Sequence, residues 1–128
     1  MTEPCYEPGK TNINFYEARL RRENGYIGLG LTLALLLFLN SSNSPALAYT
    51  LVGFPVWFAV MGFLQAYNCF CARFGVQGIQ NAARMASEPT AIASSRARDC
   101  DKRKSKQFVW IAFACSVLAI VSSITLLA

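Results

Sequence analysis

The sequence contains no histidine among its 128 residues. Histidine is the commonest metal ligand in proteins and the commonest general base near neutral pH. Its absence also removes the usual axial ligand of haem iron. No constellation of catalytic residues stands out elsewhere in the chain, so we expect a protein that is not an enzyme and has no cofactor of its own.

Charge is scarce and unevenly placed. Charged residues make up 15% of the chain, against about 25% in a typical soluble domain. The ranges 24–72 and 107–128 contain no charged residue at all. A water-soluble fold must place charge on every surface element, so uncharged stretches of this length favour lipid. At 128 residues the chain allows one domain at most, and we expect a single integral membrane domain over residues 1–128.

The five cysteines are an odd number, which excludes a complete disulfide framework. Cys69 and Cys71 form a C-x-C pair after the second apolar stretch, and soft thiolates of this kind bind Cu(I) or exchange electrons. Arg73 would favour the thiolate form of a neighbouring cysteine, and Cys100 would supply a third ligand. Two ligands do not make a metal site, and free cysteines are often simply buried. We therefore favour incidental thiols and keep thiol chemistry at Cys69 and Cys71 as the alternative.

The first apolar stretch, Tyr26–Leu39, is short for a membrane span. Its 14 residues would cover about 21 Å as a helix, against roughly 30 Å of hydrocarbon. Extension over the flanking polar residues to 25–41 brings it near the lower limit. A re-entrant segment is one alternative. A signal peptide is another, with Arg19, Arg21 and Arg22 as its basic region and Ala46-Leu47-Ala48 as its cleavage site. That cleavage would fall inside the next apolar stretch, so a span is favoured.

The second and third apolar stretches are long enough to span. The second covers 46–70, and Pro55 inside it predicts a kink, since proline lacks the N–H that an α-helix needs. The third covers 108–128, whose 21 residues reach about 31 Å. Phe108 and Trp110 at its start suit a membrane interface. The predicted fold class is an all-α membrane protein with three transmembrane helices.

Two segments lie outside the predicted spans. Residues 1–24 should hold a short juxtamembrane helix, capped by Asn12 or Asn14. Residues 72–107 should form a basic loop, with the charge run 99–106 as the solvated start of the third helix. Within this loop, apolar residues at roughly helical spacing predict an interfacial helix; they are Phe74, Val76, Ile79, Ala83 and Met85.

The whole net charge of +5 lies between the second and third stretches, where eight basic residues face three acidic ones. By the positive-inside rule, the N-terminus and this loop are cytoplasmic and the C-terminus lies outside. Such a cluster favours contact with anionic lipids. Nucleic acid is not expected, because no aromatics that would stack on bases are interleaved with the charges. The predicted lipid contacts are Arg96, Arg98, Lys102, Arg103, Lys104 and Lys106.

Small residues recur at helical spacing in the second and third spans. Such faces let two membrane helices approach closely, within one chain or between subunits. Together with the small size and the lack of catalytic groups, they predict a non-catalytic accessory or structural subunit that packs against other membrane proteins. The residues concerned are Gly62 and Ala66 in the second span, and Ala112, Cys115, Ser116, Ala119 and Ser123 in the third.

A basic helix, Glu17-Ala18-Arg19-Leu20-Arg21-Arg22, precedes a glycine-containing first span. The second span then ends in Gly62-Phe63, Cys69-Phe70-Cys71 and Phe74-Gly75. In these features Glu17 to Gly78 resembles small bacterial inner-membrane hairpin proteins, such as the membrane domain of the YgaP-like family. Those proteins usually carry Cys-Pro here, whereas Cys71 is followed by Ala72, and the third span is extra. The resemblance implies a bacterial inner membrane.

Overall fold

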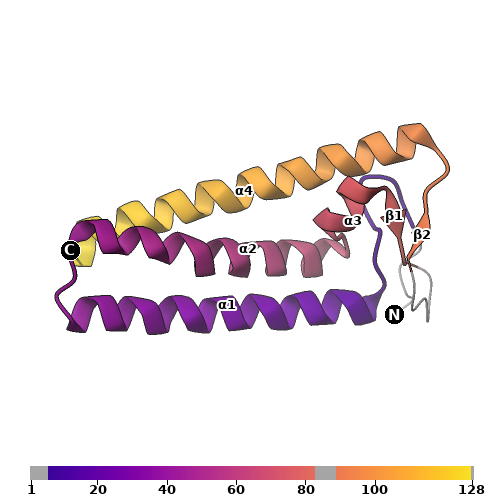
Figure 1. Cartoon of the computed structure of the whole chain (residues 1–128). Coiled ribbons are helices and arrows are strands. Elements are labelled where there is room, and N and C mark those ends of the chain that lie inside the picture. Colours follow the sequence, from indigo (N-terminus) through magenta and orange to yellow (C-terminus); the bar gives the residue numbers. More distant parts are fainter. Residues whose placement is uncertain (1–5, 83–88, 128) are drawn as a thin grey trace.

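The structure, a computed structural model, describes residues 6–82 and 89–127, and most of these are helical (Figure 1). Three helical segments are long and apolar enough to cross a membrane, namely Phe15–Ser41, Ala46–Asn68 and Ser95–Leu127. This confirms the predicted all-α membrane fold with three transmembrane helices. In chain order the elements are α1 (Phe15–Ser41), the 3₁₀ helix η1 (Ala46–Val52), α2 (Gly53–Asn68), α3 (Ala72–Gln77), β1 (Ile79–Gln80), β2 (Thr90–Ala91) and α4 (Ser95–Leu127).

Helix α1 joins two segments that the sequence analysis separated. It begins at Phe15 behind the N-cap Asn14, whose side chain accepts a hydrogen bond from the Glu17 amide. The expected short juxtamembrane helix is therefore the first part of α1, which continues without a break through Asn24 and Gly25, where Gly25 packs closely on Phe63 of α2. Its 27 residues extend about 40 Å, of which the uncharged part, residues 24–41, covers about 27 Å.

The second span changes helix type just before Pro55. A 3₁₀ helix runs to Val52 and the α-helix starts at Gly53, so Pro55 lies in the first turn of α2. In a continuous α-helix, Pro55 would leave the Leu51 carbonyl without its amide partner and would clash with it. The sequence predicts a kink at Pro55; the structure has a change from 3₁₀ to α geometry two residues before it.

Helix α4 begins well before the predicted third span. It runs for 33 residues from Ser95, about 50 Å, which exceeds the whole bilayer thickness of about 40–45 Å. The predicted start at Phe108 is only the point where the charged residues of the helix end. The helix begins earlier because the lysines and arginines before Phe108 are good helix formers. The charge run 99–106 lies in the helical start of α4, as expected, but it is not wholly solvated, because Asp101 within it is buried.

The segment predicted as a loop over 72–107 is therefore largely structured. It holds α3, the antiparallel pair β1–β2 and the first turns of α4. The predicted interfacial helix is only partly present: Phe74 and Val76 lie in α3 and Ile79 lies in β1. Ala83 and Met85 lie outside the described residues.

Helix α2 lies between α1 and α4 and packs against both (Figure 1). At one end of the bundle the chain folds into what we call the cap, made of residues 6–14, 69–82 and 89–106. The C-terminal end of α4 lies at the opposite end, beside the connection between α1 and η1 (Figure 1). The N-terminal segment and the basic segment thus share one end, as three spans require.

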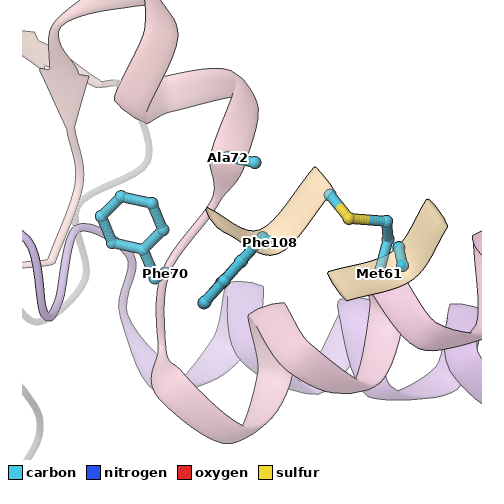
Figure 2. Packing of buried hydrophobic residues seen from close by; sticks show 5 residues of the cluster. Met61, Phe70, Ala72 and Phe108 are labelled. Carbon is cyan, nitrogen blue, oxygen red and sulfur yellow. The ribbon is translucent and has the colours of Figure 1, made fainter. Parts of the chain in front are cut away.

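A small hydrophobic core lies where α2, α3 and α4 meet beneath the cap (Figure 2). The rings of Phe70 and Phe108 pack edge to face with their centroids 5.5 Å apart. Met61, Ala72 and Ala112 complete the cluster, and all five side chains are buried. This core joins the cap to the spans.

Candidate functional site

The C-x-C turn is joined to the N-terminal segment by Asn12. This fully buried side chain donates from Nδ2 to the Cys71 carbonyl (3.1 Å) and accepts at Oδ1 from the Cys71 amide (2.6 Å). The amides of Asn12 and Ile13 both donate to the Cys69 carbonyl, at 3.0 and 3.3 Å. Every one of these bonds uses backbone of the turn, so the motif acts here as a structural joint.

The two thiols of the motif have different surroundings. Cys71 is 3% exposed, and its Sγ accepts a bond from Nη2 of Arg21 at 3.4 Å. Cys69 is half-buried, and burial raises the pKa of its thiol. Sequence reasoning paired the thiols with Arg73, but α1 places Arg21 there instead. Arg21 is 50 positions from Cys71 in the chain, and no local sequence pattern links two positions so far apart.

Cys100 does not join the other two cysteines. Its Cβ lies beside Gly9 at the outer side of the cap. Within residues 6–82 and 89–127, no three His, Cys, Asp or Glu side chains gather in a way that would hold a metal ion. The three-thiol site considered from the sequence is thus not formed.

Asp101 is a fully buried carboxylate in α4. It accepts hydrogen bonds from the Tyr6 hydroxyl (2.9 Å) and from the Gly9 amide (2.6 Å). Burial, together with the bond to Asp101, raises the pKa of Tyr6. Sequence reasoning placed Asp101 on a solvated face. The structure makes it the group that ties the N-terminal segment to α4.

Helix α3 is pinned between α2 and α4 at Ala72. The Ala72 amide donates to Oε1 of Gln65 (3.0 Å), and its carbonyl lies 2.9 Å from the buried hydroxyl of Ser105. Gly75 lets α3 come this close, since a Cβ there would lie 2.9 Å from the Asp101 carbonyl. As a result Arg73 and Lys106, the residues next to the pinned pair, border the same hollow.

A groove runs along the seam between α2 and α4. It consists of two hollows of about 560 and 470 Å³ that share Trp57, and we call it the α2–α4 groove. The hollow next to the cap is bordered by Arg21, Arg73 and Lys106 and floored by apolar side chains. The other is lined almost wholly by apolar residues, with Thr50 and Ser116 as its polar members. The groove is therefore basic at the cap and apolar along its length.

The six residues predicted to contact anionic lipid do not form one surface. Lys106 borders the α2–α4 groove, whereas Arg103 and Lys104 line a separate hollow of about 480 Å³ near Gly9. Arg98 donates from Nη1 to the carbonyls of Ile92 (2.6 Å) and Ala93 (3.0 Å). Arg96 and Lys102 are exposed. Arg21 and Arg73 border the groove as well and were not among the six.

Most of the predicted helix-packing residues are used inside the chain. Gly62 is buried against α1, where a Cβ would lie 2.7 Å from the Arg21 carbonyl oxygen and the Gly25 nitrogen. Ala66 is half-buried, and Cys115 and Ala119 lie beside the buried face of α4 and are partly exposed. That buried face follows helical spacing along the helix and comprises Ala97, Asp101, Ser105, Phe108, Ala112, Ser116 and Ser123.

No protein-family model, characterised protein or solved structure matches the chain. The resemblance of residues 17–78 to YgaP-like membrane domains stays a prediction.

Proposed function

We propose that this chain is a non-catalytic accessory subunit that assembles with other membrane proteins through the outer face of α1. The observation that carries the proposal is a pair of exposed small residues one helical turn apart on that face, Gly30 and Ala34, which we call the small-residue step. Gly30 and Ala34 are exposed, while Gly28 and Thr32 are buried on the other side of the helix. A Cβ at Gly30 would meet no described atom within 4 Å.

A small-residue step at i and i+4 lets a second helix come close enough for backbone contact. By contrast, Gly62 is buried against α1, and Ala112, Ser116 and Ser123 belong to the buried face of α4. Three buried polar residues of the cap support a role without chemistry. Their side chains form hydrogen bonds with backbone groups or with Tyr6; these residues are Asn12, Asp101 and Ser105.

The test is extraction of a C-terminally tagged chain in mild detergent, followed by mass spectrometry of whatever is retained. Stoichiometric partner subunits are expected with the natural chain and are lost with Gly30→Leu. Ala114→Leu is the matched control, because Ala114 is exposed on α4 and lies away from the step. A chain that purifies alone and monodisperse contradicts the proposal.

We further propose that the cap lies in the cytoplasm of a bacterium, that the spans cross its inner membrane and that the C-terminus lies outside. All charged side chains sit in residues 3–23 and 73–106, and the described ones gather at the cap end, where the positive-inside rule places them in the cytoplasm. Alkaline phosphatase fused after residue 43 or at the C-terminus should be active, and fused at the N-terminus inactive. The reverse pattern would invert the topology.

A thiol-based redox or metal-handling function at Cys69 and Cys71 is the second candidate. The contact between Arg21 and the Cys71 sulfur favours it, because cationic neighbours are typical of reactive cysteines. The 3% exposure of Cys71 limits access to it. Changing both cysteines to serine should abolish metal content or redox activity of the purified chain, while Cys115→Ser should not. Equal behaviour of the two variants removes this candidate.

A further inference from the structure

The α2–α4 groove has charge at one end only. Along α4 its lining runs from Lys106 at the cap to Ile120, and every residue from 107 to 128 is uncharged. Over these 14 positions the helix rises about 21 Å. Half of a hydrocarbon core of roughly 30 Å is about 15 Å. The groove is therefore long enough to accompany one leaflet from its headgroups to its chain ends.

Two of the three cations at the basic end are not paired with any described residue. Neither Arg73 nor Lys106 makes a hydrogen bond or an ion pair within the described part of the chain. Arg21, the third cation of the rim, differs because it forms an ion pair with Glu17 at 2.6 Å. Arg73 and Lys106 are both exposed and border one hollow, so two positive charges face the same space without a counterion from residues 6–82 or 89–127.

The walls below these cations suit a hydrocarbon chain. Trp110 lies one helical turn beyond Lys106, and Trp57 borders both hollows. Phe54, Phe113, Val117 and Ile120 line the remainder. Tryptophan typically sits at the level of the headgroups with its ring toward the chains. The order along the groove is thus paired cations, aromatic rings and aliphatic wall.

We propose that the α2–α4 groove binds one anionic phospholipid, with its phosphodiester between Arg73 and Lys106 and an acyl chain along α2 and α4 past Trp57. Charge complementarity at the rim selects this occupant over a zwitterionic lipid, which brings its own cation. It also selects it over a partner helix, whose insertion would leave both cations uncompensated. The pinning of α3 at Ala72 holds the two cations in place.

The groove contains its own reporter, because Trp57 and Trp110 are the two tryptophans of the sequence. The experiment places the full chain in phosphatidylcholine nanodiscs and adds phosphatidylglycerol with brominated acyl chains, which quench tryptophan on contact. Brominated phosphatidylcholine with the same chains is added in a parallel series. Quenching by phosphatidylglycerol should saturate at a low mole fraction, whereas quenching by phosphatidylcholine should follow its bulk concentration.

The deciding variant is Arg73→Gln with Lys106→Gln. Each basic residue near a membrane surface contributes roughly a fivefold factor to anionic-lipid affinity. The preference for phosphatidylglycerol should therefore fall by up to about thirtyfold. The matched control is Arg96→Gln with Lys102→Gln, which removes the same charge from exposed positions outside the groove and should retain most of the preference.

Equal quenching by the two lipids in the natural chain would overturn the proposal, since it would leave only ordinary boundary lipid. An equal loss of preference in both double variants would also overturn it, because the effect would then come from general surface charge. A third outcome is that neither lipid quenches the tryptophans and that another subunit co-purifies with the chain. This result would also overturn the proposal, because the groove would then be covered by a protein partner.

Discussion

The two faces of α2 are packed in opposite ways. Against α1 the backbones meet closely: a Cβ at Gly28 would lie 2.7 Å from the Ala59 nitrogen, and Tyr26 packs edge to face on Phe63 with centroids 5.1 Å apart. Against α4 the same helix leaves two hollows of about 560 and 470 Å³. One seam is thus closed by backbone contact, and the other is open to an occupant.

The difference comes from where the small residues meet. On the closed seam, Gly62 of α2 lies directly against Gly25 of α1, so neither helix holds the other away. On the open seam, the side chains of Trp57 and Phe113 line the groove and are exposed, and polar pins in the cap hold α4 in place. The closed seam thus joins two helices by backbone contact, whereas the open seam leaves the hollows that we propose lipid occupies.

The largest effect is expected where the closed seam is forced open. Gly62→Leu adds a side chain where a Cβ alone would lie 2.7 Å from backbone atoms of α1, and overpacking of this kind costs up to about 3 kcal/mol. Unfolding of the variant by SDS in bicelles should occur at a clearly lower SDS fraction. Gly30→Leu, in open space on the same hairpin, should change little. Equal effects of the two changes would contradict the closed seam.

Loss of the Asn12 side chain should have the next largest effect. Asn12→Ala leaves the buried amide of Cys71 without its partner, while the Cys71 carbonyl keeps only the bond from the Gly75 amide. An unpaired buried group costs about 1–3 kcal/mol. The free energy of unfolding should fall by about 2 kcal/mol, and the N-terminal segment should become sensitive to protease. Asn68→Ala is the control, because Asn68 bonds only to the Leu64 carbonyl of its own helix. Protease resistance in both variants would argue against the joint.

A smaller effect is expected from the pin between the N-terminal segment and α4. Tyr6→Phe removes the bond to Asp101 and should cost about 1 kcal/mol at pH 7. The pKa of folded Tyr6 is raised above its ordinary value, about 10 in unfolded chains. The unfolded chain therefore loses this proton first, and the stability that Tyr6 contributes declines as pH rises beyond about 10.

Unfolding measured from pH 7 to 11 separates this pin from other groups. Tyr6→Phe should flatten the part of the decline that begins near pH 10. The stability also declines in a range below pH 10, because the pKa of the Cys69 thiol is raised. This part of the curve should be the same in Tyr6→Phe and in the natural chain. Identical curves for the two proteins would show that the hydroxyl does not hold the segment on α4.

The smallest effect is expected on the open seam. A Cβ at Gly53 would lie 2.9 Å from Cδ1 of Ile120, the far end of a flexible side chain beside a hollow. Gly53→Ala should change the free energy of unfolding by less than about 0.5 kcal/mol, because the gain in helix propensity offsets a slight shift of Ile120. A loss as large as that of Gly62→Leu would mean that the two seams are equally tight.

Much of the fold followed from the sequence, because spans depend on local composition. The uncharged ranges 24–72 and 107–128 predicted the spans. The continuity of α1 and α4 was missed because hydropathy detects only the apolar part of a helix, and charged first turns such as 99–106 are equally helical. The cap was missed because its contacts join distant positions, Asn12 with Cys71 and Tyr6 with Asp101.

The sequence by itself determined that this protein is a three-span membrane protein with its charge at one end, because transfer of apolar and charged side chains to lipid is a property of each residue. Only the tertiary structure decided which face of α2 closes on α1 and which stays open toward α4. It also decided that Asp101 is buried and that Arg73 and Lys106 border one hollow. Those outcomes depend on which side chains meet across helices, and no local stretch of sequence contains that information.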